Sequence, residues 1–328
     1  MAALTGTTQT YGVGSAGGNR EDLEDVIWQL SPLETYCLTN FDRVDANATL
    51  HEWEIDSMVA PAANRQLEGD DVTFTSIVSP TRVGNYTQIS RKEFLVSGTQ
   101  EQVKSAGRPN GRSEVKRQLK KKMMELKNDM EYAIVRNQVS SAGGATTARS
   151  LGSIETFIAT TDNSGNGVRA TTTAAASTAA YAAGSVVTDG TTTGTMQEAK
   201  FKEAVSLAWV DGGQPSIVLV ESIQKQTISA FSGIATKYND VSGSKATIVG
   251  SADVYASEWG DLTIKLHRHV RSSVCLILDP DYWAIAFLRS PFMEELAKTG
   301  DGWKRHMLAE YTLVGRNANS SAKVVACA

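Results

Sequence analysis

Residues 49–97 carry the alternating pattern of strands but too few large apolar side chains to build a core of their own. On the outward run, from Thr49 to Met58, one face carries His51, Trp53 and Ile55. The opposite face carries only acidic side chains, namely Glu52, Glu54 and Asp56. Because a two-residue period is the signature of a strand, this run predicts a strand with one face suited to burial.

The return run repeats the alternation. Val72, Phe74 and Val78 alternate with threonines, and a further extended run follows from Tyr86 to Val96. The small polar stretch between the two runs, 60–71, contains a proline and a glycine, so the chain should reverse there. A lone two-stranded ribbon is at best marginally stable in water. We therefore expect this arm to lie on something outside its own domain, which favours assembly over catalysis.

The charge of the chain is small overall but unevenly distributed. With 328 residues, 41% hydrophobic and 21% charged, the chain has the composition of a soluble protein with room for two or three compact units. Its net charge of −4 argues against nucleic-acid binding by the whole surface. The first sixty residues are strongly acidic, whereas residues 104–136 are basic. This asymmetry predicts charge-complementary contacts within or between chains.

Cysteine usage and the N-terminus point to a reducing, cytosol-like setting. Cys37, Cys275 and Cys327 are far apart and odd in number, which disfavours a disulfide framework or a zinc site. The N-terminal residues show neither a charged region nor an apolar region of a secretory signal. No stretch approaches the ~20 apolar residues that span a bilayer, so we expect no membrane partner.

Residues 113–138 form the clearest predicted helix. Apolar residues recur at three- and four-residue steps, namely Val115, Leu119, Met123, Leu126, Met130 and Ile134. Ser113 can cap the N-terminus, and Gly143 and Gly144 lie beyond the end. Such a helix would be a rod of roughly 39 Å at 1.5 Å per residue, long for a globular domain.

The remaining pattern mixes strands and helices. A short helix is predicted at 20–30, and further helices at 196–209 and 223–231. Strands are predicted at 217–220, 254–266, 274–278 and 308–314, with a compact apolar run at 283–288. This alternation predicts a small α/β unit. Residues 160–197 are dominated by Thr, Ala and Gly, so we interpret them as a surface insertion or long loops.

Four local motifs admit a functional interpretation, but a simpler one is favoured for each. Gly12, Gly14 and Gly17 match a dinucleotide fingerprint without the preceding strand it needs. His267 and His269 have metal-ligand spacing, but neighbouring arginines favour a surface strand. Residues 68–71 are acidic but lack the spacing of an EF-hand, which favours a solvated turn or an acidic patch that meets an arginine. Asp279 or Asp281 more simply caps a helix that begins there.

The basic helix face admits two interpretations. It carries Lys116, Arg117, Lys120, Lys121 and Lys122. Without interleaved aromatic residues it can meet nucleic acid through phosphates alone, and the alternative is a solvated helix face. Since no nucleophile elbow, phosphate loop or catalytic triad is recognisable, we expect a protein that is not an enzyme and binds no cofactor.

Seven segments, in this order, carry a family resemblance. They are Asn19–Leu23 (NREDL), Leu50–Trp53 (LHEW), Leu67–Asp71 (LEGDD), Asn85–Gln100 (NYTQISRKEFLVSGTQ), Leu278–Trp283 (LDPDYW), Glu294–Asp301 (EELAKTGD) and Glu310–Leu313 (EYTL). In these segments the chain resembles the major capsid (major head) proteins of tailed bacteriophages, which have the Hong Kong 97-type fold. The joint occurrence of the segments is specific, although each alone is weak.

The resemblance implies an α+β capsid fold in four parts. Residues 1–48 would be an N-terminal arm and 49–97 an extended loop, a β-hairpin that lies across an adjacent subunit. Residues 98–142 and 286–328 would form a peripheral domain with the long spine helix, and 143–285 an α/β axial domain. Similar proteins assemble as hexamers and pentamers into an icosahedral head, in the bacterial host cytoplasm, around double-stranded DNA. A cellular encapsulin-like compartment is the alternative, and a cofactor-binding enzyme a distant third.

The resemblance also implies partners and contact residues. The extended loop would contact the neighbouring subunit through Trp53, Ile55, Glu68, Asp70, Asp71, Phe74, Arg82 and Arg91. Some relatives cross-link their shells from a lysine in this loop, but here 50–91 contains no lysine, so non-covalent contacts are expected. A portal and separate scaffolding or cement proteins are expected partners, because the chain begins at the arm. An N-terminal scaffolding extension missing from this form is the other explanation.

Overall fold

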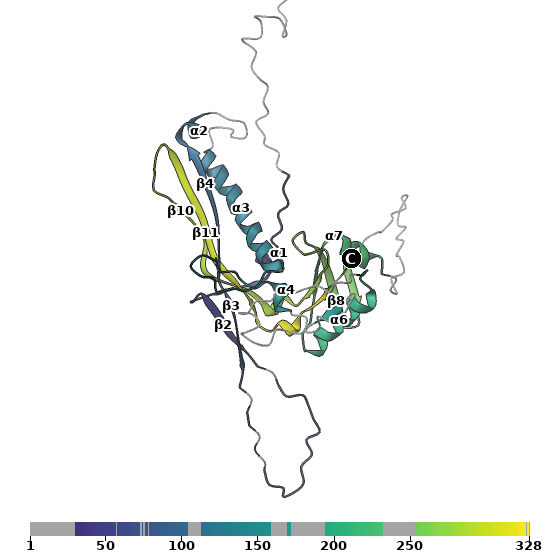
Figure 1. Cartoon of the computed structure of the whole chain (residues 1–328). Coiled ribbons are helices and arrows are strands. Elements are labelled where there is room, and N and C mark those ends of the chain that lie inside the picture. Colours follow the sequence, from purple (N-terminus) through teal and green to yellow (C-terminus); the bar gives the residue numbers. More distant parts are fainter. Residues whose placement is uncertain are drawn as a thin grey trace, which may run out of the picture.

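The structure is a computed structural model that describes residues 30–56, 58–72, 74, 76–77, 79–103, 113–158, 169–171, 194–231, 253–325 and 327. Its strands belong to a four-stranded sheet, a six-stranded sheet and a two-stranded ribbon. Figure 1 shows an elongated body around the long helix, a rounder unit beside it, and a loop that projects away from both. The predicted helix at 20–30 and the Gly12–Gly17 motif lie outside the described residues, apart from Leu30.

The four-stranded sheet carries the long helix. Its strand order is β1 (Asp42–Asp45), β10 (Trp283–Glu295), β11 (Gly302–Gly315) and β4 (Gln88–Ser97). β1 runs parallel to β10, and the other pairs are antiparallel. The short helix α2 (Gly98–Gln102) follows β4, and helix α3 (Glu114–Val135) packs against β4 and β11. The sheet and helix together form the elongated part of the molecule (Figure 1).

Helix α3 confirms the strongest prediction from the sequence. Ser113 is the N-cap, and its hydroxyl accepts a hydrogen bond from the Lys116 backbone N–H at 3.4 Å. Leu126, Met130 and Ile134 are buried on the predicted stripe. The helix ends at Val135, three residues before the predicted end, because Arg136 adopts an extended conformation.

The six-stranded sheet builds the second unit. Its order is β5 (Arg169–Thr171), β12 (Ala322–Val325), β9 (Cys275–Leu278), β6 (Ile217–Val220), β8 (Gly260–Leu266) and β7 (Val254–Ser257). β6 and β8 are parallel, and helix α7 (Ser222–Ser229) lies between them in the chain. Helix α6 (Glu198–Val210) buries Phe201 and Val205 in the core of this unit. This is the predicted α/β unit, with the predicted strand at 254–266 split into a β7–β8 hairpin.

The C-terminal strand differs from the division expected from the family resemblance. Residues 286–328 were expected to return to the peripheral domain, but β12 pairs with β9 and β5 in the six-stranded sheet. Four consecutive buried residues in β12 explain the placement, because a strand buried on both faces is stable only in a sheet interior. At the other junction Asp279 caps a 3₁₀ turn at Pro280–Tyr282, as predicted, by accepting from the Asp281 N–H.

The two-stranded ribbon is the base of the extended loop. β2 (Leu50–Ile55) pairs antiparallel with β3 (Thr81–Tyr86), from Leu50 opposite Tyr86 to Ile55 opposite Thr81. The predicted alternation in β2 is confirmed, since Trp53 and Ile55 are half-buried whereas Glu52 and Glu54 are exposed. The predicted strand at 72–78 is wrong for its described residues, which belong to no strand. They have the sequence of a strand, but none of the described strands pairs with them.

A hydrophobic core joins the two units. Short helices α1 (Tyr36–Asn40) and α4 (Ile154–Phe157) contribute Cys37 and Phe157 to it, and the 3₁₀ helix η4 (Ala318–Ser320) contributes Ala318. Phe157 stacks on Trp53 of the ribbon and meets Trp283 edge to face, with ring centroids 6.0 and 5.9 Å apart. The ribbon is therefore fixed to the core at its base. No helix among the described residues is long and apolar enough to cross a membrane.

Candidate inter-subunit interface

The loop tip, which we define as residues 56–80, presents apolar side chains to solvent. Six described residues are between 71% and 99% exposed, namely Met58, Val59, Leu67, Val72, Phe74 and Ile77. Figure 1 shows the loop tip reaching beyond the rest of the molecule. Contiguous exposed apolar surface on a soluble protein marks an interaction site. In this subunit the described apolar side chains of the loop tip are therefore left open to solvent.

The acidic residues of the loop tip form an exposed turn, as predicted. Gly69 has a φ of +82°, a backbone conformation that favours glycine, and the Asp70 N–H donates to the Leu67 carbonyl at 3.2 Å. Glu68, Asp70 and Asp71 are exposed, and no lysine or arginine in the described part of the chain forms an ion pair with them. Their carboxylates are available to a cation on another molecule.

Asn85 fastens the base of the extended loop. Its amide nitrogen donates to the carbonyls of Gly152 and Leu313, at 3.1 and 2.8 Å. Its amide oxygen accepts from the Ser140 hydroxyl and the Gly152 N–H, at 2.9 and 2.8 Å. The side chain is fully buried, so all its hydrogen-bonding capacity is used inside the protein. These four hydrogen bonds fix the base of the loop to the body of its own subunit.

The predicted contact residues fall into two groups. Trp53 and Ile55 pack against the core of their own subunit, so their contact with a neighbour stays a prediction. The others are exposed. Arg82 lies 3.9 Å from Glu52 on the paired strand, and Arg91 on β4 lies 2.9 Å from Glu93. A tryptophan in an alternating strand does not reveal which molecule covers it, which is why the sequence placed Trp53 at an interface.

The outer sheet face, made by Ile89, Arg91, Leu95 and Phe292, is a second surface that exposes apolar side chains, here among charged ones such as Glu93. Lys92 on β4 reaches across to Asp129 of α3 at 2.6 Å, so its neighbours Arg91 and Glu93 face away from the helix. Phe292 is on the same face, because it pairs through Leu308 with Arg91. Ile89, Leu95 and Phe292 are 47%, 63% and 37% exposed. None of the described helices packs on this face.

The basic face of α3 is only partly free. Arg117 pairs with Glu114 and Lys122 with Glu125, at 2.9 and 2.7 Å. Lys116 and Lys120 are exposed and Lys121 is half-buried, and these three form no ion pair with described residues. Three of the five predicted cations are therefore available to an anionic partner.

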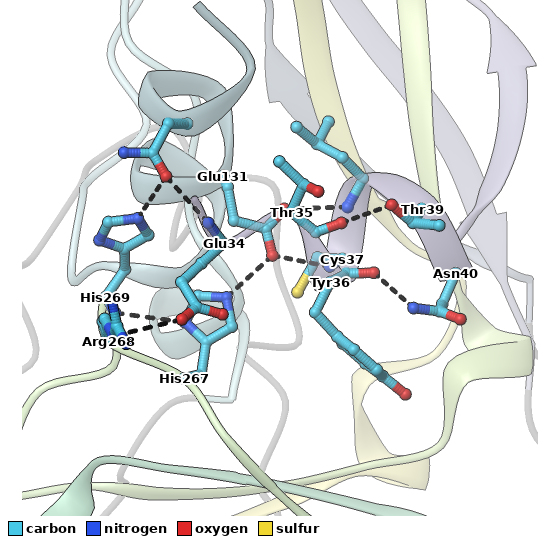
Figure 2. A network of polar contacts seen from close by, with 12 residues as sticks. Glu34, Thr35, Tyr36, Cys37, Thr39, Asn40, Glu131, His267, Arg268 and His269 are labelled. Atoms are coloured by element: carbon cyan, nitrogen blue, oxygen red, sulfur yellow. Dashed lines mark hydrogen bonds and ion pairs between the residues drawn. The ribbon is translucent and has the colours of Figure 1, made fainter. Parts of the chain in front are cut away.

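A buried carboxylate joins the N-terminal arm to α3 (Figure 2). Glu131 accepts hydrogen bonds from the backbone N–H groups of Cys37 and Leu38, at 2.6 and 2.9 Å. These two residues are in the first turn of α1, whose own N-cap residue Thr35 makes no capping bond. Glu131 supplies the missing cap from another helix, where a negative charge is also favoured by the helix dipole.

The same carboxylate holds the turn after β8. Glu131 Oε1 lies 3.0 Å from Nε2 of His267, and both side chains are fully buried. The His269 N–H donates to Nδ1 of His267 at 3.3 Å, so Nδ1 is the acceptor and Nε2 carries the proton. The prediction of a surface strand at 267–269 is therefore wrong. His267 is 1% exposed because it packs against α3, a contact that the local sequence does not encode.

Asn128, one turn earlier on α3, also bridges the arm and the 267–269 turn. Its Oδ1 accepts from the Glu34 N–H at 3.2 Å and from Nε2 of His269 at 2.9 Å. Glu34 is also 3.4 Å from Arg268. We call this set of contacts among the arm, α3 and the 267–269 turn the arm junction. Its only sequence signal is a single acid, Glu131, within the otherwise apolar run at the end of α3.

The arm junction contains groups whose protonation is shifted. Burial, reinforced by the nearby Glu131 carboxylate, raises the pKa of the Cys37 thiol well above its usual value, so the thiol is neutral. Burial, followed by the neighbouring His267, lowers the pKa of His269. Glu131 and Glu34 oppose this shift, and Arg136 adds to it. The folded protein therefore favours the neutral imidazole at position 269.

The shift at His269 predicts a loss of stability in mild acid. Because the unfolded chain binds this proton more readily, its contribution is complete above the ordinary pKa of 6.5 and is lost as the pH falls below it. His269→Gln keeps a donor toward Asn128 but cannot titrate. We expect the urea midpoint to drop less between pH 7.5 and pH 5.5 in this variant than in the wild type. Equal drops would show that His269 does not contribute.

Solved capsid structures share this fold. The capsid asymmetric unit of cyanophage A-1(L) is similar at a TM-score of 0.65 and 12% identity, covering 94% of this chain and 96% of that chain. The capsid of a native GTA particle gives 0.64 at 8% identity, covering 95% and 97%. A structure titled Gordonia phage Cozz gives 0.59 at 11% identity, covering 98% and 95%. These likenesses run over nearly the whole of each chain, and at such low identity they establish the fold alone.

A family model establishes the membership. No curated protein matches the chain. The model described as SU10 major capsid protein matches residues 4–328, almost the whole chain, and gives no support to the cellular-compartment alternative. The chain therefore belongs to the SU10 major capsid protein family, and it is a structural subunit of a phage capsid with the Hong Kong 97-type fold.

Proposed function

We propose that copies of this chain hold each other by laying the loop tip of one subunit on the outer sheet face of the next. The single observation that carries the proposal is the exposure of the loop tip, where Phe74 and Ile77 are 91% and 96% exposed. The outer sheet face offers exposed Leu95 and Phe292 as an apolar counterpart. Obligate interfaces bury ~2,000–5,000 Å², so the proposed contact requires both the loop tip and the outer sheet face to be covered over much of their surface.

Charge would fix the register of this contact. The loop tip carries Glu68, Asp70 and Asp71, whereas Arg91 lies on the outer sheet face. Charge pairs at the rim of an interface set specificity and association rate more than affinity. Since residues 50–91 contain no lysine, the proposed contact is non-covalent.

The arrangement we propose is an icosahedral head of hexamers and pentamers. Residues 143–285 would form the axial domain at the capsomer centre, and 98–142 with 286–328 the peripheral domain. Residues 1–48 and 49–97 would be the N-terminal arm and the extended loop. Support comes from the family and from the presence of two sheets, one of four strands and one of six. β12 is an exception to the division, because it belongs by sequence to 286–328 but pairs in the six-stranded sheet.

The proposed partners are those of a DNA container. The head would assemble in the bacterial host cytoplasm and enclose double-stranded DNA, with a portal for entry and separate scaffolding or cement proteins. Its role would be structural, without catalysis. Electron microscopy of the purified subunit, alone and with its phage partners, tests the proposal. Closed shells support it, whereas a monomer under all these conditions contradicts it.

The free lysines of α3 predict a salt-dependent contact with packaged DNA. Each phosphate contact by Lys116, Lys120 or Lys121 releases counterions, so its contribution falls steeply with salt. The triple variant with glutamine at these positions should lose genome from filled heads at a lower salt concentration than the wild type. The matched control changes Lys200 and Lys202, which pair with Glu203 and Glu198 on α6. Equal retention in all three proteins would contradict the contact.

A further inference from the structure

The N-terminal arm follows α3 in a fixed register. Cys37 and Leu38 contact Glu131, and Glu34 contacts Asn128, so falling arm numbers match falling helix numbers. One step further, residues 31–33 and four side chains of α3 line a groove of about 660 Å³. These side chains are Lys121, Met124, Glu125 and Asn128. Followed from Leu38 back to Ser31, the arm therefore runs along α3 toward the N-terminus of the helix.

The same line on α3 leads to free cations. Residues 117, 121, 124 and 128 are three or four apart and lie on one helix face. The line therefore passes from Asn128 through Lys121 to the turn that carries Arg117 and Lys120. Lys120 and Lys121 have no ion-pair partner among the described residues. Residues that precede Ser31 in the chain would therefore meet the basic N-terminal half of α3 if the arm continued in the same direction.

The part of the arm that precedes the groove in the chain is negatively charged, which complements the lysines of α3. Leu30 and Leu33 are 104% and 51% exposed, so the part of the arm nearest the groove is not yet covered. Just before them in the chain come four acids, namely Glu21, Asp22, Glu24 and Asp25. Only Arg20 opposes them within residues 20–29.

We propose that residues 20–29 dock on the N-terminal half of α3 of the same chain, with their carboxylates against Lys116, Lys120 and Lys121. The reach is sufficient. Asp25 and Glu34 are nine residue steps apart, and an extended chain of nine steps spans up to ~30 Å. α3 rises only ~18 Å between Lys116 and Asn128.

The same chain is favoured over a neighbour because of the tether. The arm junction holds Glu34 on α3. Residues 20–29 are tethered to it by a short segment, so their effective concentration near Lys116, Lys120 and Lys121 is in the millimolar range. A second subunit at micromolar concentration cannot compete with that. The docking rests on the arm register and on charge, and it applies to the unassembled subunit, in which no packaged DNA competes for the same lysines.

Hydrogen exchange on the unassembled full-length subunit tests the docking. Protection factors of the amides at 20–29 should fall about three- to tenfold in Lys120→Glu/Lys121→Glu, as expected for the loss of a few surface ion pairs. Asp22→Lys/Asp25→Lys should have the same effect, and combining the two pairs of substitutions should restore protection. Raising the salt to about 0.5 M should reduce wild-type protection.

The control and the contrary outcomes are direct. Lys202→Glu/Lys265→Glu makes the same charge change at exposed sites on α6 and β8, away from α3, and should leave protection at 20–29 unchanged. An unprotected wild-type segment, or no restoration in the combined variant, would overturn the docking. Carbodiimide cross-linking of mixed light and heavy isotope subunits separates the alternatives. Links between Glu24 and Lys120 should join chains of the same isotope, and predominantly mixed-isotope links would overturn docking within one chain.

Discussion

Replacing residues 56–80 with Asn-Gly will yield a folded subunit that no longer assembles into shells. Ile55 pairs with Thr81, so a two-residue turn closes the ribbon in its existing register. The removed residues include the exposed apolar side chains of the loop tip, and none of those that the structure describes belongs to the core. Circular dichroism and thermal unfolding should therefore remain close to the wild type, while electron microscopy should show no closed particles.

A second loop variant distinguishes the contribution of the apolar side chains to assembly from that of the length of the loop. Changing Met58, Val72, Phe74 and Ile77 to serine keeps the loop but removes most of its apolar surface, at roughly 25 cal/mol per Å² that assembly would otherwise bury. Shell formation should fail at the concentrations that suffice for the wild type. Normal shells from the Asn-Gly variant would refute the proposed role of the loop tip. Normal shells from the serine variant alone would assign that role to the backbone.

Glu131→Ala will be the most destabilising single substitution that we predict. It removes the acceptor for the N–H groups of Cys37 and Leu38 and for Nε2 of His267, all in the protein interior. Each buried donor left without a partner costs about 1–3 kcal/mol, so the total should be at least about 3 kcal/mol. Denaturant unfolding of the unassembled subunit measures the loss directly.

Two further substitutions on α3 make the effect of Glu131→Ala specific. Glu125→Ala removes a half-exposed carboxylate that pairs with Lys122, and should cost less than about 1 kcal/mol. Glu131→Gln keeps the shape but turns an amide N–H₂ toward one of the donors, so its cost should be intermediate. If Glu131→Ala cost no more than Glu125→Ala, the buried carboxylate would not hold the arm junction.

The elements with a strong local period were predictable. Helix α3, its Ser113 cap and its buried stripe follow from apolar spacing, and β6 appears at its predicted residues. The exposed acidic turn at 68–71 likewise follows from its composition. In each case the side chains that fix the element are neighbours in sequence, so the local pattern carries the information.

Residues whose partners are distant in sequence were not predictable in this way. His267 has the spacing of a surface strand, yet it is buried against α3, where Glu131, 136 residues away, accepts a hydrogen bond from its Nε2–H. The described residues of 72–78 have the pattern of a strand and remain unpaired. Asn85 appears in the sequence as a polar residue of an alternating run, although it fastens the ribbon to Leu313. Pairing and burial depend on which chain segments meet, and a local pattern does not specify that.

By itself the sequence determined an arm that lacks its own core, a long basic helix and a family resemblance. Only the tertiary structure decided what each surface meets. It turned Trp53 inward, left the loop tip uncovered, and used Asn128 and Glu131 to join the arm and the 267–269 turn to α3. The physical reason is that periodicity fixes which face of an element is apolar, whereas the energy of a buried polar group depends on a partner brought to it by the whole fold.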